Sequence, residues 1–314
     1  MGADNLTTTA NFILVGFTND RKTQILLFGI ILIVYIFILV GNLGVIMLAQ
    51  ADSHLRTPMY FFLTHLSALD ICYVTSTMPQ MLAHLFVGHG ELSVIQCVLQ
   101  TYTALALSCA EAFLLGVMAY DRYLAICHPL TYATAMERWH QVLLAAACWA
   151  GGFCVSVVCT SLIFSHSYCH PCCINHFICE IAMVLKLACD DIHFTEIIIF
   201  LFAGMVILIP FSVITISYGL ILFSVFQMQS VSGLRKAFST CGSHLSVVTL
   251  FYGTTTLNYI IPQSGRSPDS DKQIAVLYVV VTPLLNPIIY TLRNKDVHAA
   301  VAKMVQRLGF ASKS

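Results

Sequence analysis

Residues 118–129 are Met118-Ala119-Tyr120-Asp121-Arg122-Tyr123-Leu124-Ala125-Ile126-Cys127-His128-Pro129, and they place an Asp-Arg pair at the end of a long apolar run. A run of about 20 mostly apolar residues is long enough to cross a bilayer as a helix. A charged pair at its end either anchors the helix at the membrane boundary or takes part in a conformational switch. The rest of the chain separates these two interpretations.

The composition predicts a membrane protein. Of 314 residues, 58% are hydrophobic and only 10% are charged, with a mean hydropathy of +0.83. This is too apolar for an ordinary soluble domain. The hydropathy therefore indicates membrane lipid as the surroundings of the chain. The 15 basic and 15 acidic residues cancel, so no overall charge favours binding to nucleic acid.

Seven stretches are apolar and long enough to cross the membrane as helices. We place them near residues 24-49, 58-83, 96-125, 139-163, 194-226, 237-262 and 272-292. Residues 1-23 precede them, and 293-314 follow as a short amphipathic helix and tail, because apolar residues recur there at helical spacing with cations between them. The chain is therefore expected to form an all-α membrane protein.

Charge in the loops predicts the orientation of the bundle. With the N-terminus outside, the outer segments hold five of the 15 Lys and Arg residues and the inner segments hold the other ten. The positive-inside rule therefore favours an extracellular N-terminus. No removable signal peptide is expected, so the first helix would direct its own insertion. Asn5-Leu6-Thr7 is a potential glycosylation site, which fits this orientation.

Cysteines gather around one predicted outer loop. Cys97 begins the third span, and Cys169, Cys172, Cys173, Cys179 and Cys189 lie between the fourth and fifth. In an oxidising compartment they favour a loop held by disulfides, whose connectivity spacing alone does not determine. The alternative is a soft-metal site with His176 and Cys179 as its best candidates, near His166 and His170. A disulfide at Cys179 would remove its thiolate.

Two carboxylates fall in the middle of predicted spans, Asp70 in the second and Glu111 in the third. Ionisable groups at that depth are costly and are functional candidates by default, although each could be a protonated, hydrogen-bonded core group. Arg122 lies eleven residues after Glu111, roughly 16 Å along the helix and at the inner boundary. Pro210 and Pro287 remove backbone donors inside their spans, so both are hinge candidates.

No catalytic motif is present: we find no HExxH, GxSxG or Walker glycine loop and no triad in a plausible order. The sequence therefore predicts a binding protein and not an enzyme.

Five segments together carry a family resemblance: Gly41-Asn42, Pro58-Met59-Tyr60-Phe61-Phe62-Leu63, Asp121-Arg122-Tyr123, Lys236 to Leu245 and Pro283 to Tyr290. In this order they resemble the signatures of vertebrate odorant receptors, which are rhodopsin-like G-protein-coupled receptors. The resemblance implies a seven-transmembrane helix bundle with a short eighth helix in the plasma membrane. It also implies disulfides Cys97–Cys179 and Cys169–Cys189, with Cys97–Cys189 as an alternative.

The resemblance assigns two further groups of residues. One group forms a hydrated pocket that holds a sodium ion or a shared proton: Asp70, Glu111, Asn42 and Asn286. The other group acts in activation and G-protein coupling: Asp121, Arg122, Tyr123, Tyr218, Asn286, Pro287 and Tyr290. In this scheme a carboxylate holds the Arg122 guanidinium at rest and releases it when the helices move.

The same fold implies a ligand cavity in the outer third of the bundle. Its expected lining is Thr101, Ala104, Leu105, Ser108, Cys109, Ile181, Phe202, Ala203, Val206, Tyr252, Thr255, Thr256, Tyr259, Val276 and Val279. These residues are mostly apolar with scattered hydroxyls, and no carboxylate lies near Ala104. The lining therefore predicts a small, neutral, volatile-type ligand.

Binding of such a ligand would activate a stimulatory, olfactory-type G protein and raise cyclic AMP. One alternative is a chemoreceptor of the same fold that works outside the olfactory epithelium. Another is an ion transporter that uses Asp70 and Glu111 as an ion path. Seven spans without an inverted repeat speak against the transporter.

Overall fold

The computed structural model describes residues 11–18, 20–88, 90–169, 172–227, 231–259, 268–292 and 297, without the side chains of 231–240, 259, 268–269 and 291–292. Four sequence predictions lie outside this description. They are the glycosylation site at Asn5, the side chain of Tyr259, the end of the sixth span after residue 259, and the helix over 293–314 apart from Val297.

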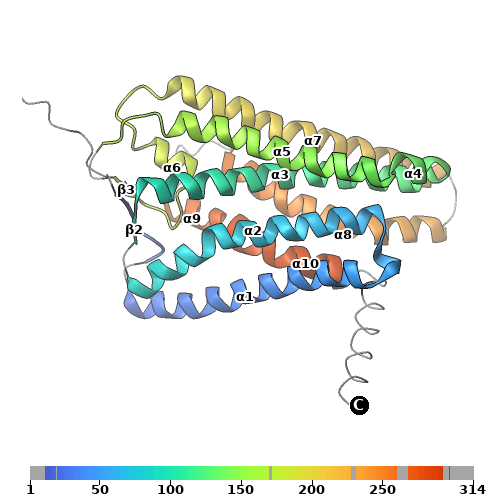
Figure 1. The fold of residues 1–314 in the computed structure, drawn as a ribbon, viewed down its shortest axis with the longest axis horizontal. Helices are drawn as coiled ribbons and strands as arrows, with labels where there is room; N and C mark the ends of the chain where they lie inside the picture. The colour runs from blue at the N-terminus through green and yellow to red at the C-terminus, as the bar shows by residue number, and fades with distance from the viewer. Residues whose placement is uncertain are drawn as a thin grey trace, which may run out of the picture.

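Long helices lie side by side along one axis (Figure 1). They are α1 (Arg21–Ala51), α2 (Pro58–Val87), α3 (Val94–Cys127), α5 (Arg138–Ile163), α7 (His193–Gln227), α8 (Val231–Tyr259) and a last helix in three parts, α9 (Pro268–Val276), η2 (Leu277–Val281) and α10 (Thr282–Leu292). Shorter helices are η1 (Ser53–Leu55), α4 (Pro129–Ala135) and α6 (Ile181–Leu185). Each long helix corresponds to one of the predicted spans.

Several long helices extend past the apolar stretch because polar residues cap them. Asp20 accepts a hydrogen bond from the backbone N–H of Thr23, which starts α1. Ser93 and Gln96 exchange side-chain and backbone hydrogen bonds in a capping box at the start of α3. Helix α2 ends at Gly88, which has a φ of 93°, a left-handed conformation that glycine adopts readily. Hydropathy does not detect these caps.

The bundle buries polar groups within its apolar core and exposes apolar side chains on its outer face. Phe223 and Leu208 of α7 are 63% and 58% exposed, whereas Asp70 and Asn42 are at most 1% exposed. In water this arrangement would expose apolar surface and bury polar groups, so the outer face requires lipid. Five helical segments of the described chain are long and apolar enough to cross a membrane: Arg21–Ala51, Val94–Cys127, Arg138–Ile163, His193–Gln227 and Ser270–Tyr290. The chain is a multi-pass membrane helix bundle.

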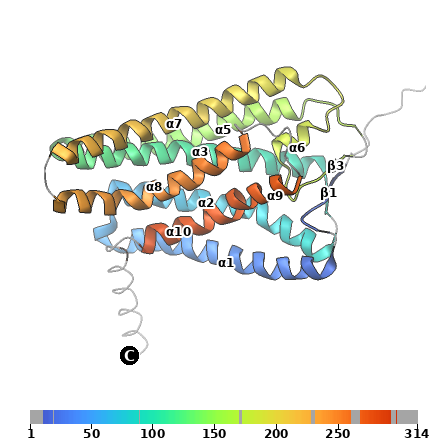
Figure 2. The same cartoon turned by 180° about the vertical axis from the view of Figure 1, so that it is seen from behind.

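A small β-sheet closes one end of the bundle, which we call the sheet end (Figure 2). The strands β1 (Phe12–Leu14), β2 (Gly90–Leu92) and β3 (Cys173–Ile174) pair in the order β2-β1-β3. β1 runs antiparallel to β2 and parallel to β3. The prediction of an all-α chain is corrected here, because three short segments from distant parts of the sequence pair only after the helices bring them together.

Helix α3 lies at the centre of the bundle and contacts α2, α5, α7 and α8. Small residues allow close approach of the helices around it. Gly152 of α5 faces the backbone of α3 at Ala106 and Ala110, and Gly116 of α3 faces Pro210 of α7. Gly41 of α1 similarly faces Pro287 of α10. Close contact of small residues replaces the hydrophobic drive that packs helices in water.

The last helix contains a π-helical segment, η2, between α9 and α10. A continuous span was predicted over 272-292. Such π-helical turns are rare and occur frequently at functional sites. Here the turn lies near the candidate site, because Tyr278 of η2 and Thr282 at its C-terminal boundary both line a cavity.

Candidate functional site

A loop fixed by disulfides covers the interior at the sheet end. Cys97 at the start of α3 is bonded to Cys179, and Cys169 is bonded to Cys189, as the family resemblance implied. Hydrogen bonds reinforce the first link: the N–H of Cys179 donates to Oε1 of Gln100 at 2.8 Å, and Thr101 Oγ1 donates to the Cys179 carbonyl at 3.2 Å. The residues around Cys179 therefore form a roof that is tied to α3.

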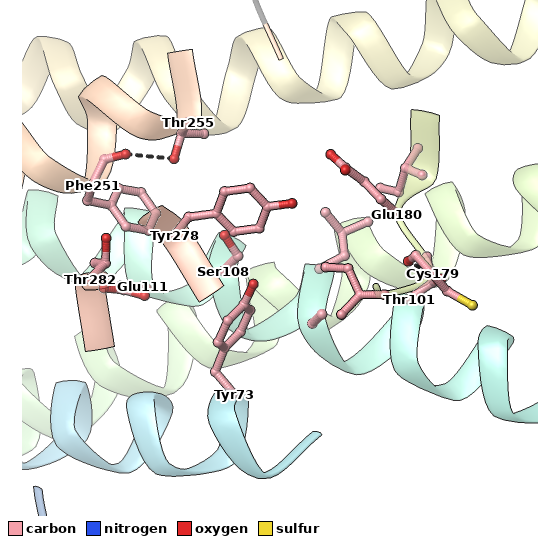
Figure 3. Close-up of a pocket in the computed structure, with 14 residues that line it drawn as sticks. Tyr73, Thr101, Ser108, Glu111, Cys179, Glu180, Phe251, Thr255, Tyr278 and Thr282 are labelled. Carbon is pink, nitrogen blue, oxygen red and sulfur yellow. Dashed lines mark hydrogen bonds between the residues drawn. The ribbon is translucent and has the colours of Figure 1, made fainter. Parts of the chain in front are cut away.

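Two adjoining cavities lie beneath this roof, and Figure 3 shows the first of them. The first, which we call the polar cavity, has a volume of about 60 Å³ and reaches α2, α8 and η2. The second, the apolar cavity, has a volume of about 50 Å³ and lies between α3, α5 and α7. Both are lined by Leu105, Ser108, Ile181, Phe251 and Thr255. One small molecule could therefore extend from one cavity into the other.

Most residues that the sequence suggested as ligand contacts line these cavities. They are Thr101, Ala104, Leu105, Ser108, Cys109, Ile181, Phe202, Ala203, Val206 and Thr255. Tyr252, Thr256, Val276 and Val279 line neither cavity. Tyr252 is buried instead and donates from its hydroxyl to the carbonyl of Ala112 at 2.9 Å. These four positions were predicted from helical spacing, which does not fix how far a helix is rotated about its axis.

The polar cavity contains two carboxylates that the predicted lining did not include, Glu111 and Glu180. Glu180 is 5% exposed and accepts a hydrogen bond from Nδ2 of Asn258 at 2.7 Å. Burial raises the pKa of Glu180, against the opposing effect of this hydrogen bond. The sequence did carry a signal for this residue, because Glu180 follows Cys179 directly and the disulfide places that segment above the cavity.

His176 packs against Glu180 on the inner side of the roof. Its Nδ1 accepts the N–H of Ile178 at 3.2 Å, so the ring hydrogen is assigned to Nε2, which lies 3.3 Å from Oε2 of Glu180. Burial lowers the pKa of His176 to about 4, and the charge of Lys272 acts in the same direction. The imidazole is therefore neutral at physiological pH.

The alternative of a soft-metal site has little geometric support. Cys179 is in a disulfide and has no thiolate to offer. Both ring nitrogens of His166 are engaged, Nδ1 with Asp190 at 2.9 Å and Nε2 with Thr195 at 2.8 Å. Within the described ranges, no group of three or more His, Cys, Asp or Glu residues is arranged to hold a metal ion. Neither Cys172 nor Cys173 is in a disulfide: Cys172 is buried and its Sγ donates to the carbonyl of Cys169 at 3.3 Å, whereas Cys173 is exposed.

Three of the four predicted pocket residues meet in the middle of the bundle. Nδ2 of Asn286 lies 3.1 Å from each carboxylate oxygen of Asp70 and 3.4 Å from Oε1 of Glu111. Asn42 is buried, but its amide donates to Ile38 in its own helix at 3.1 Å. In the described part of the chain, the side-chain oxygens of Asn42 and Asn286 have no hydrogen-bond partner. Asn286 therefore bonds Asp70 and does not bridge the backbone carbonyl freed by Pro287.

At the other end of α3, Asp121 has a hydrogen-bond partner from another helix. Asp121 is 1% exposed and its Oδ1 accepts a hydrogen bond from the hydroxyl of Tyr132 in α4 at 2.8 Å. Among the described residues, no ion pair joins Asp121 and Arg122. The charge of Arg122 acts on Asp121 and also on Tyr218 and Tyr290. The hold of the guanidinium by the adjacent carboxylate stays a prediction.

A buried hydrogen bond beside Arg122 links α7 and α8. The hydroxyl of Tyr218 lies 2.6 Å from Nδ1 of His244, and both residues are at least nine-tenths buried. His244 belongs to the helix-six signature, but no partner could be assigned to it from the sequence. Tyr123 extends the other way and contacts His128 Nε2 at 2.8 Å through its hydroxyl. Tyr218 and Tyr123 thus contact different histidines, His244 and His128.

The fold and the site together define a membrane helix bundle that can bind a small molecule near one end and carries a polar cluster at the other. An olfactory receptor family model matches residues 31–307. The chain is 45% identical to olfactory receptor 5P52 of Mus musculus over 309 residues, which covers 98% of this chain and 99% of that protein. It is 42% identical to olfactory receptor 2T6 of Homo sapiens over 307 residues, covering 98% of this chain and 100% of the relative.

The chain belongs to the olfactory receptor family. This family consists of G-protein-coupled receptors, so the protein is a multi-pass receptor of the plasma membrane and not an enzyme.

Proposed function

We propose that this receptor binds a small, neutral, volatile odorant in the two adjoining cavities and activates a stimulatory, olfactory-type G protein, which raises cyclic AMP. The carrying observation is the pair of cavities under the disulfide-fixed roof, because they offer mostly apolar walls with a few polar groups, as small-molecule sites do. Acidic ligands fit poorly, since Glu111 and Glu180 would repel a carboxylate.

We further propose that the chain crosses the membrane seven times with the sheet end outside the cell. Helices α2 and α8 then join the five more apolar helical segments as the sixth and seventh spans. Both pack against other helices of the bundle, so less of their surface has to face lipid. The disulfides at the sheet end support this orientation, because disulfides persist in oxidising compartments. The same orientation leaves Asn5 available for glycosylation and puts residues 293–314 on the cytoplasmic leaflet as an eighth helix.

We propose that Asp70, Glu111 and Asn286 hold a sodium ion or share one proton in the resting receptor. Two carboxylates that contact one amide in an apolar interior cannot both be charged without a cation or a proton between them. The unpaired side-chain oxygens of Asn286 and Asn42 add uncharged oxygen donors of the kind that a hard cation prefers. Ligand binding would disrupt this pocket as the helices rearrange.

We propose that the opposite end couples to the G protein through Arg122. Because Asp121 is engaged by Tyr132, the guanidinium can face the interior between α7, α8 and α10. Tyr218 and Tyr290 supply hydroxyls there, and Pro287 provides a flexible point in the last helix. The hydroxyl of Tyr123 contacts His128 and lies outside this interior cluster.

The decisive experiment measures cyclic AMP in cells that express this receptor with an olfactory-type G protein, against a panel of neutral odorants and their acids. Neutral compounds are expected to activate and carboxylates are expected to fail. Arg122→Ala should abolish the response while surface staining persists. Tyr259 variants would change which odorants act without abolishing coupling.

A matched control is Arg138→Ala, which removes a cation whose guanidinium stacks on the ring of Phe61 at 4.4 Å, outside the coupling cluster. It should leave coupling intact. A normal response from Arg122→Ala would refute the role of that residue. Strong activation by carboxylates would refute the proposed lining.

A further inference from the structure

The polar groups in the otherwise apolar walls of the polar cavity are mostly hydrogen-bond acceptors. Among its described lining residues there is no Lys, Arg, His, Asn, Gln or Trp side chain. The polar groups are two carboxylates and a set of hydroxyls. Because an ionised carboxylate only accepts hydrogen bonds, the balance between donors and acceptors depends on where the hydroxyl hydrogens point.

Three threonine hydroxyls in this wall already donate to backbone carbonyls. Thr101 donates to Cys179 at 3.2 Å, Thr255 donates to Phe251 at 2.8 Å, and Thr282 donates to Leu277 at 3.1 Å. A hydroxyl has a single hydrogen, so each of these groups presents only lone pairs to the cavity.

The roof above the cavity also uses its donors internally. The backbone N–H of Ile178 donates to His176, that of Cys179 donates to Gln100, and that of Glu180 donates to the carbonyl of Ile178. Tyr278 hydrogen-bonds the Glu180 carboxylate, and Figure 3 shows its hydroxyl directed toward that side of the cavity. Tyr73 and Ser108 carry the other two hydroxyls of the wall, and a hydroxyl can donate or accept.

The apolar cavity differs in chemistry. Phe202, Val206 and Ile207 of α7 and Val155 of α5 line it, and its described lining contains no charged side chain. Because the two cavities share lining residues, a ligand can place a polar head against the acceptors and an alkyl tail between α3, α5 and α7.

We propose that the ligand is an alcohol whose hydroxyl donates a hydrogen bond to the acceptors of the polar cavity, with Glu180 as the specificity-determining group. This proposal rests on the proposed function and narrows its ligand class. A ketone, ester or ether of the same size offers no donor, so the acceptor lone pairs that face the cavity gain no partner from it and lose contact with water, which is costly in a buried site. An ammonium head would lose its hydration shell against a carboxylate that Asn258 and Tyr278 already share.

The test compares 1-heptanol with hexyl methyl ether, which has the same number of heavy atoms but no hydroxyl, and with heptanoate. In wild-type receptor the alcohol should be at least about tenfold more potent than the ether, and heptanoate should be inactive. In Glu180→Gln the ratio of alcohol to ether potency should fall to about threefold or less. Glu91→Gln, on the exposed face of β2, is the matched control and should keep the ratio.

A second variant guards against a folding defect in Glu180→Gln. Thr255→Val keeps the side-chain volume and removes the lone pairs that face the cavity, so it should weaken the alcohol and leave the ether unchanged. Thr249→Val is its control, because Thr249 makes the same type of bond on the exposed face of α8, to Leu245 at 2.8 Å. Equal potency of alcohol and ether in wild-type receptor, or a ratio unchanged in both cavity variants, would overturn the proposal.

Failure of the proposed function has a different signature. If no compound raises cyclic AMP although the wild-type receptor reaches the surface, coupling is refuted. The same pairs are then measured by thermal shift of purified receptor, which requires no G protein. A larger shift with 1-heptanol than with hexyl methyl ether supports the proposal, and equal shifts overturn it.

Discussion

Replacement of Gly152 by alanine should destabilise the contact between α5 and α3. A Cβ atom at this position would lie 2.8 Å from the backbone nitrogen of Ala110 and 3.0 Å from its Cβ, and closer still to the carbonyl oxygen of Ala106. These are backbone and first side-chain atoms of a central helix, so no rotamer change can relieve the overlap. The two helices would have to move apart.

The expected cost follows from two opposing effects. Overpacking a well-packed contact costs about 1–3 kcal/mol, whereas alanine in place of glycine inside a helix gains at most about 1 kcal/mol. The net destabilisation should therefore reach about 2 kcal/mol. For a chain of 314 residues a loss of that order lowers the melting temperature by roughly 3 °C.

The assay is thermal unfolding of purified receptor together with surface staining. Gly29→Ala is the matched control, because no atom lies within 4 Å of a Cβ there, and it should be neutral or stabilising. Gly151→Ala should have an intermediate effect, since its Cβ meets only the ring of Phe113 at 3.2 Å, which can rotate. If Gly152→Ala melts at the same temperature as Gly29→Ala, the packing argument fails.

Three further outcomes are expected. Cys97→Ser opens a disulfide that spans 82 residues and should cost about 4–5 kcal/mol, so surface expression falls, while Cys173→Ser, at an exposed free thiol, should express normally. The pKa of His176 is lowered to about 4, so the unfolded chain takes up a proton at this residue before the folded receptor does as the pH falls. Between pH 7 and pH 5 the wild-type receptor should therefore lose about 2 kcal/mol more free energy of unfolding than His176→Gln. Equal losses in the two proteins would contradict this. Tyr218→Phe removes the hydrogen bond to His244 beside Arg122 and should lower ligand-independent cyclic AMP. Its control is Tyr120→Phe, at an exposed ring, which should leave that signal unchanged. Equal basal signals in the two variants would show that the bond does not affect signalling.

The long helices could be predicted from the sequence because lipid imposes a simple rule. Backbone groups in hydrocarbon must bond within their own segment, so apolar length indicates a helix. The predicted stretch 139-163 agrees with α5 to within one residue at its start. The ends of α1 and α3 were less accurate, since Asp20 and the capping box at Ser93 extend the helices through polar sequence.

The sheet end could not be predicted in the same way. β1, β2 and β3 contain two or three residues each, and none carries a pattern that distinguishes a strand from a loop. Their pairing depends on the loop held at Cys97 and Cys169, which brings residues 173–174 beside residues 13–14. Such contacts depend on sequence separation and chain topology, which a local pattern does not contain.

By itself the sequence determined that this chain is a membrane receptor, because its apolar runs and its ordered motifs are local properties that need no coordinates. It also identified the residue types that matter, among them Asp70, Glu111 and Arg122. Only the tertiary structure decided their partners: Asn286 joins the two acids, and Tyr132 bonds Asp121, the neighbour of Arg122. It also placed Glu180 in the cavity wall. Which side chains pair and which line a cavity depend on the rotation of the helices and the position of the loop, and both are fixed by packing across the whole bundle.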